Sequence, residues 1–194
     1  MHHRRLALSF CLCTGVAIAV AILPGCKRAP DEADQPAVTE PADPDMVTIE
    51  LPQANSEIGV TLTAAPAGLV ATYSGEHWIE LADAARPRLL FTLVSDPQHA
   101  SGVAVVDIND FEEALTNRDD GRFTGDGEIE TALGEARWVS GSFAEDGEVI
   151  EQILVSAPHP SGSGRLTVSS TCPSGVATVK ERLDTIEGLL EHVS

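Results

Sequence analysis

The sequence predicts an α+β fold: a mostly antiparallel sheet with a short internal helix and a C-terminal amphipathic helix packed on it. From Val47 onward, short apolar runs alternate with turn residues, which is typical of strands. One short helical segment interrupts these runs, and a longer one closes the chain after the last of them. This order of elements is typical of α+β proteins.

The strands are expected where apolar runs are bounded by turn-forming residues. In the run that begins at Gly59, Val60 and Leu62 share one face while Thr61 lies on the other. Asp146-Gly147 is the clearest hairpin signal, because this pair supplies the positive φ angles of a type I′ turn. The expected strands cover residues 47–51, 59–64, 69–73, 78–81, 89–95, 103–107, 128–133, 136–143, 149–157 and 165–170.

Two helices are expected. Asn109 and Asp110 can cap a short helix over residues 111–117. The second helix covers residues 176–193, with Ser174 as its candidate N-cap. The apolar residues that recur there at three- and four-residue spacing, and that should pack on the sheet, are Val176, Val179, Leu183, Ile186, Leu190 and Val193.

The first 25 residues have the three parts of an export signal. Residues 1–5 include Arg4 and Arg5, and residues 6–23 form an almost wholly apolar run without charge. An apolar run of 18 residues also meets the lower length limit for a transmembrane helix, so an uncleaved membrane anchor is the alternative. The basic start and the small-residue exit favour a signal peptide over residues 1–25.

Leu23-Pro24-Gly25-Cys26 closes that run and resembles the lipobox of bacterial lipoproteins. Pro24 departs from the usual small residue. The resemblance implies that Cys26 receives a diacylglyceryl group, that cleavage occurs before it, and that its new amino group is acylated, typically with palmitate. It also implies a membrane partner through the lipid. Because Lys27 is not the aspartate that retains such proteins at the inner membrane, the implied location is the periplasmic face of the outer membrane.

Residues 26–46 are expected to be the lipidated cysteine followed by a disordered tether. Residues 27–46 contain four prolines and six acidic residues but almost no large apolar side chain. Such a stretch cannot bury enough surface to offset its ordering entropy, and proline and charge extend it to a reach of at most roughly 60 Å. Residues 47–194 then form a single globular domain.

The charge of the chain argues against nucleic-acid binding, and its cysteine content argues against an intramolecular disulfide. The chain holds 12 Lys+Arg against 30 Asp+Glu, a formal charge of −18, so nucleic acid is not an expected partner. Cys11 and Cys13 lie in the expected signal peptide and Cys26 is the expected lipid site. Cys172 is then left without an intramolecular partner, and burial is the commoner state of a free cysteine.

The domain resembles the PsbP-like fold in three places. Gly59-Val60-Thr61-Leu62, followed by Pro66-Ala67-Gly68-Leu69, is similar to the opening strand and turn of that family. Glu148-Val149-Ile150 and the closing helix are compatible with it. The resemblance implies a binding or assembly factor rather than a catalyst.

Residues 117–128 contain the strongest candidate for a metal loop. Asn117, Asp119 and Glu128 occupy ligand places of a calcium loop, but Arg122 stands where that loop needs glycine. A mobile acidic surface loop is the favoured interpretation of this segment.

The other chemistry-bearing residues are expected to be structural or solvated. P-loop, dinucleotide-binding and Cys-x-x-Cys patterns are missing from the sequence, and Ser161-Gly162-Ser163-Gly164 is expected to be a turn. The histidines His77, His99, His159 and His192 have no metal-ligand spacing. Trp78 and Trp138 are expected in the core. The glutamates Glu128, Glu130, Glu148 and Glu151 are expected on a solvated sheet face.

These observations favour a membrane-anchored lipoprotein of the cell envelope with a non-catalytic binding or assembly domain. No catalytic residue, cofactor or metal site is expected, and the protein partner in the envelope is unknown. An envelope hydrolase with a site formed only in three dimensions, and a weak calcium-binding module using residues 119–128, are the alternatives.

Overall fold

The computed structural model describes residues 48–95 and 106–194. The expected signal peptide, Cys26, the tether and His99 lie outside the described residues. Their roles therefore stay predictions.

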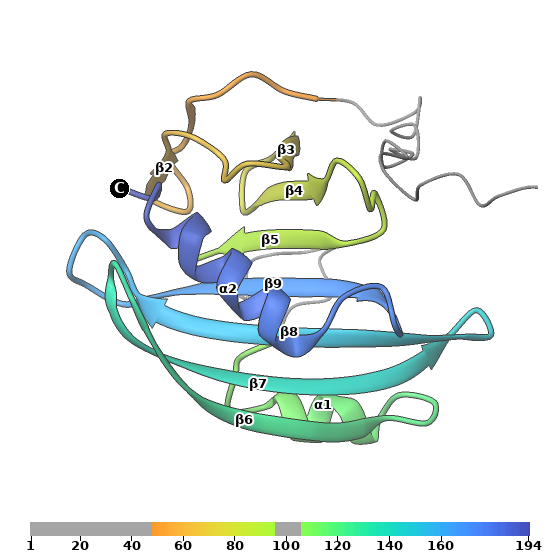
Figure 1. Cartoon of the computed structure of the whole chain (residues 1–194). Coiled ribbons are helices and arrows are strands. Elements are labelled where there is room, and N and C mark those ends of the chain that lie inside the picture. Colours follow the sequence, from red (N-terminus) through yellow and green to blue (C-terminus); the bar gives the residue numbers. More distant parts are fainter. Residues whose placement is uncertain (1–47, 96–105) are drawn as a thin grey trace, which may run out of the picture. The chain divides into compact units, whose positions relative to one another are not determined.

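The central element is an antiparallel sheet of seven strands in the order β3-β4-β5-β9-β8-β7-β6 (Figure 1). A separate antiparallel pair, β1-β2, joins the C-terminus, since the amide of Thr61 donates to the carbonyl of Ser194 over 2.7 Å. The expected α+β class is confirmed. The elements are β1 Gln53–Asn55, β2 Val60–Leu62, β3 Leu69–Ser74, β4 Ile79–Asp83, β5 Leu90–Val94, α1 Phe111–Thr116, β6 Arg122–Thr131, β7 Gly134–Glu145, β8 Glu148–Pro158, β9 Arg165–Pro173 and α2 Val179–Leu190.

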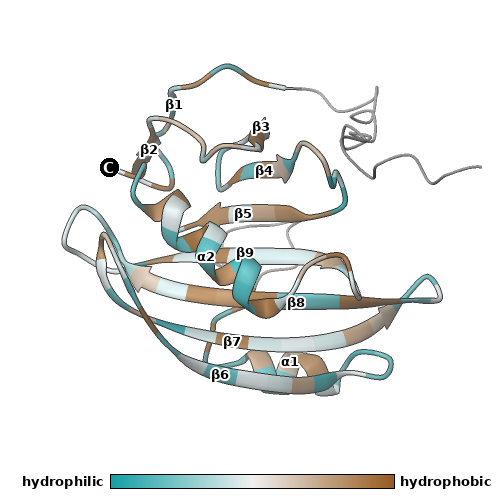
Figure 2. Cartoon of the chain, viewed as in Figure 1, coloured by the Kyte–Doolittle hydropathy of each residue, from teal (hydrophilic) through white to brown (hydrophobic). Residues whose placement is uncertain are grey.

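Each face of the sheet has its own apolar cluster and its own helix, as Figure 1 shows for α2 on the near face and α1 behind. Ile186, Leu189 and Leu190 of α2 pack with Phe91 of β5 in the larger cluster. Phe111 and Leu115 of α1 belong to the smaller one. Figure 2 shows β5 coloured mostly as apolar, in keeping with its place in the middle of the sheet. We call the two sides the α2 face and the α1 face.

The hairpin signal is confirmed. Asp146 and Gly147 connect β7 to β8 with φ angles of 50° and 83°, as a type I′ turn requires. Trp78 and Trp138 were expected in the core; each is partly buried and packs against the outside of an apolar cluster.

Three strand expectations were wrong. Residues 48–51 form only an isolated bridge between Ile49 and Ala71, and the strand lies further on at β1. Val106 and Asp107 are not in a strand, while residues 103–105 lie outside the described part. β6 begins at Arg122 rather than at residue 128, because its whole length pairs with β7 even though its first half lacks apolar alternation.

The start of α2 also differs from expectation. Thr178, not Ser174, is the N-cap: its hydroxyl accepts from the amide of Glu181 and its own amide donates to the Glu181 carboxylate. This reciprocal pair is a capping box. Leu183 is only half-buried, while Arg182, which the apolar pattern did not include, is fully buried.

Candidate functional site

The α1 face of the sheet is apolar in one half and polar in the other. Helix α1 covers the apolar half, where Val139, Phe143 and Leu154 lie beneath it. Beyond Val139 and Leu154 the same face continues with Arg137 and Ser156, because side chains two residues apart point the same way. The helix leaves this polar half uncovered.

A transverse row of polar residues crosses the uncovered half. Glu128 on β6 lies opposite Arg137 on β7, Arg137 lies opposite Ser156 on β8, and Ser156 lies opposite Thr167 on β9. Four neighbouring strands therefore each place one polar side chain in a line on the α1 face.

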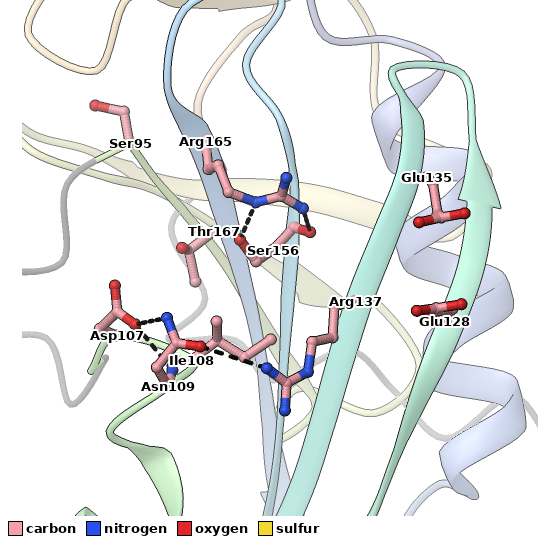
Figure 3. Close-up of a pocket in the computed structure, with 10 residues that line it drawn as sticks. All are labelled: Ser95, Asp107, Ile108, Asn109, Glu128, Glu135, Arg137, Ser156, Arg165 and Thr167. Atoms are coloured by element: carbon pink, nitrogen blue, oxygen red, sulfur yellow. Dashed lines mark hydrogen bonds between the residues drawn. The ribbon is translucent and has the colours of Figure 1, made fainter.

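This half of the face is hollowed into a cavity of about 550 Å³, which we call the α1-face pocket. Figure 3 shows its lining residues, drawn from the sheet and from the segment before α1. The described lining residues are Ser95, Asp107, Ile108, Asn109, Glu128, Glu135, Arg137, Ser156, Arg165 and Thr167. Only Ile108 among them is apolar.

The two arginines of the pocket are oriented by uncharged acceptors. Arg165 donates from Nε to Oγ of Ser156 over 2.7 Å and from Nη2 to the Ser156 carbonyl. Arg137 donates from Nη1 to Oδ1 of Asn109 over 3.3 Å. Asn109 is itself held by Asp107, whose Oδ1 accepts from the amide and from Nδ2 of Asn109 over 2.8 Å each (Figure 3).

Neither arginine has a carboxylate within ion-pair distance in the described part of the chain, although the protein is strongly acidic. The lysine and arginine residues there that do have one are Arg86, Arg88, Arg118, Lys180 and Arg182. The pocket therefore holds two guanidinium groups with N–H donors left for a ligand.

Three carboxylates also line the pocket. Glu128 lies directly across from Arg137, and Glu135 precedes Arg137 by two residues on the same face of β7. The third is Asp107, whose carboxylate accepts the two hydrogen bonds from Asn109. The ten described lining residues include neither histidine nor cysteine nor lysine. Their arrangement is suited to binding charged groups through charge-assisted hydrogen bonds.

Only the first part of the candidate calcium segment is a loop: residues 117–121 form a turn, and residues 122–128 lie in a strand, which corrects both interpretations of residues 117–128 for that second part. Asn117 is the C-cap of α1, and Arg122 to Glu128 lie within β6. Alternate side chains of a strand point to opposite faces, so they cannot surround one ion. Over residues 48–95 and 106–194, no group of three or more His, Cys, Asp or Glu side chains could hold a metal ion. Glu128 instead lines the pocket.

The remaining glutamates, and the histidines that the structure describes, do not line the pocket. Glu148 pairs with Arg88, and Glu151 lies 3.8 Å from Arg182. His159 connects two loops, since Nε2 lies 2.9 Å from the carbonyl oxygen of Ile58 and Nδ1 lies 2.8 Å from Oγ of Ser161. Of the four glutamates considered from the sequence, only Glu128 enters the pocket.

A second polar cluster is buried on the α2 face. Arg182 donates from Nε to Oγ of Ser170 over 3.0 Å and from Nη2 to the carbonyl of Glu151 over 3.2 Å. Burial lowers the pKa of Arg182 from its ordinary value. Cys172 is buried nearby, as expected of a free cysteine, and burial raises the pKa of its thiol. These contacts join α2 to the sheet.

The described residues include no helix that is long and apolar enough to cross a membrane.

No protein-family model and no curated protein matches this chain. Among solved structures, it is similar to LpqN, involved in cell envelope biogenesis of Mycobacterium tuberculosis, with 14% identity, a TM-score of 0.45, and coverage of 70% of this chain and 82% of that chain. It is also similar to the Ran-binding protein Mog1p of Saccharomyces cerevisiae, with 8% identity, a TM-score of 0.40, and coverage of 69% and 86%. A Mog1 E65A mutant gives 11% identity, a TM-score of 0.39, and coverage of 76% and 93%. With all three TM-scores below 0.5, these likenesses carry no argument about function.

Proposed function

We propose that this protein is a lipid-anchored protein of the cell envelope whose α+β domain binds a small polar ligand without transforming it. The anchor is Cys26, and the tether of residues 27–46 holds the domain away from the membrane. The observation that carries the binding role is the α1-face pocket, in which polar side chains from four strands converge on one cavity.

The anchoring part rests on Leu23-Pro24-Gly25-Cys26 at the end of an apolar export signal. Each buried methylene contributes about 0.8 kcal/mol, but a single acyl chain holds a protein only marginally. A cysteine that carries two or three chains gives stable attachment. Lys27, in the position that sorts such lipoproteins, favours the periplasmic face of the outer membrane.

The choice of a binding role over hydrolysis rests on how the pocket side chains are engaged. The hydroxyl of Ser156 accepts from Arg165, and Arg137 is engaged by Asn109. A hydrolytic serine needs a base that takes its proton. Ser156 instead faces a guanidinium, which in proteins does not lose its proton.

Metabolic labelling with a fatty acid tests the anchor. We expect label on the wild-type protein, none on Cys26→Ser, and full label on Cys172→Ser, which removes a buried thiol elsewhere in the chain. Label that persists on Cys26→Ser would show that the lipid is attached elsewhere and would overturn the proposal.

A further inference from the structure

The α1-face pocket presents unpaired charges of both signs. We propose that it takes a small zwitterion, whose oxyanion lies between Arg137 and Arg165 and whose ammonium group faces Glu128 and Glu135. This inference deepens the proposed function and rests on it. It identifies the ligand by its two charges rather than by its name.

The oxyanion end is defined by two arginines on strands that are two apart in the sheet. β7 and β9 flank β8, and Arg165 precedes by two residues Thr167, which is in register with Ser156 and Arg137. The Cα atoms of the two arginines therefore lie roughly 12 Å apart, at about 4.8 Å per strand and about 3.3 Å per residue. Arginine side chains are long enough for both guanidinium groups to reach one anion across that distance. Arg165 already donates to Ser156, and Arg137 to Asn109, which orients each group while leaving donors free.

The ammonium end is defined by Glu128 and Glu135 of the neighbouring strands β6 and β7, which Figure 3 draws to the right of Arg137, on the side away from Arg165. Neither Glu128 nor Glu135 takes part in a hydrogen bond or ion pair within the described part of the chain. Both are exposed, and both line the cavity. An ammonium group placed there would gain two carboxylate acceptors without displacing an existing contact.

The balance of charges argues against a ligand of one sign. Asp107, Glu128 and Glu135 supply three negative charges against the two of Arg137 and Arg165. A simple anion would be repelled by the glutamates, and a simple cation would be repelled by the arginines. A molecule that carries both charges satisfies both ends. A cavity of about 550 Å³ lies within the usual range for small-ligand sites.

Titration calorimetry of the full-length protein in an uncharged detergent tests this inference. The zwitterionic probes are O-phosphoethanolamine, whose oxyanion is a phosphate, and alanyl-alanine, whose oxyanion is a carboxylate. Inorganic phosphate, acetate and ethanolamine are the singly charged controls. We expect at least one zwitterion to bind, about tenfold or more tightly than any singly charged probe. The stronger zwitterion then identifies the source of the oxyanion.

Charge-removing variants assign the two ends. Arg165→Gln and Arg137→Gln should each weaken zwitterion binding by about tenfold, the scale of one lost charged hydrogen bond. Arg122→Gln, an exposed arginine of β6 that does not line the pocket, is the matched control and should leave binding unchanged.

The double variant Glu128→Gln/Glu135→Gln gives a readout that a structural role would not produce. It should weaken zwitterion binding while strengthening binding of inorganic phosphate, because the repelling carboxylates are gone. The double variant Glu187→Gln/Glu191→Gln, at two exposed residues in and just after α2, is the control for the same change in net charge. Thermal unfolding of each variant confirms that it is folded before it is titrated.

Three results would overturn the inference. If inorganic phosphate binds as tightly as the zwitterions, the pocket is a binding site but its ligand is a simple anion. If Arg122→Gln has the same effect as Arg165→Gln, binding does not occur in the pocket. If no zwitterion binds in the millimolar range, the proposed ligand class is wrong. The lipid anchor is tested separately, by fatty-acid labelling of Cys26.

Discussion

Arg182 on α2 and Ser170 on β9 form a buried hydrogen bond, in which Nε of Arg182 donates to Oγ of Ser170 over 3.0 Å. Arg182 is 1% exposed and Ser170 is 0% exposed. The same guanidinium donates to the carbonyl of Glu151 and lies 3.8 Å from its carboxylate. One side chain thus connects the C-terminal helix to two strands in the middle of the sheet.

Replacement of Arg182 by alanine should destabilise the fold strongly. The change leaves a void and removes the donor to Oγ of the buried Ser170, and a buried polar group left unpaired typically costs about 1–3 kcal/mol. Urea unfolding measures the effect. Lys180→Ala on the same helix, with a side chain 82% exposed, should change the free energy of unfolding by less than about 0.5 kcal/mol. Equal midpoints for the two variants would show that Arg182 does not hold the helix.

Thr178→Ala should lower the free energy of unfolding by about 1 kcal/mol, because it removes the hydroxyl of the capping box. Ser174 was the expected N-cap, but its exposed hydroxyl donates to Glu151 instead. Ser174→Ala should therefore stay within about 0.5 kcal/mol of the wild type. If Ser174→Ala lowers the free energy of unfolding more than Thr178→Ala does in urea, Ser174 rather than Thr178 is the N-cap of α2.

Replacement of either of two glycines by alanine should change the free energy of unfolding, but in opposite directions. Gly147 has a φ of +83°, where a side chain costs about 1–2 kcal/mol, so Gly147→Ala should destabilise the protein. Gly188 lies inside α2, and a Cβ there would meet nothing within 4 Å. Gly188→Ala should therefore raise stability by about 0.5–1 kcal/mol. Thermal unfolding of both variants checks the pair, and a shift in the same direction for both would contradict this account.

The sequence predicted the elements with strong local signals. Asp146-Gly147 required a tight turn whichever strands surrounded it, and the apolar spacing from Val179 to Leu190 required a helix. β6 was found only in part, because its first half contains polar residues and glycines instead of apolar alternation. Its pairing with β7 is a tertiary contact. Gly127 allows that pairing, since a Cβ there would lie 2.8 Å from Nε1 of Trp138.

The pocket was not predicted, because its residues come from segments far apart in the sequence. One part of it was within reach: the Asp146-Gly147 turn places Glu145 opposite Glu148 and thereby sets Arg137 opposite Ser156. Arg165 could not be added in this way, because the pairing of β9 depends on the turn that follows Pro158. The sequence singled out Glu128 as part of an apparent calcium motif, but in the structure Glu128 lies opposite Arg137 and lines the pocket.

Mass spectrometry of the mature N-terminal peptide, isolated from membranes, tests the central claim that a lipid on Cys26 anchors this domain. The account predicts a peptide that begins at Cys26 and is heavier than its amino-acid sequence by the mass of a diacylglyceryl group, with or without one further acyl chain. A peptide that begins at Met1, or that begins at Cys26 without added mass, would contradict it.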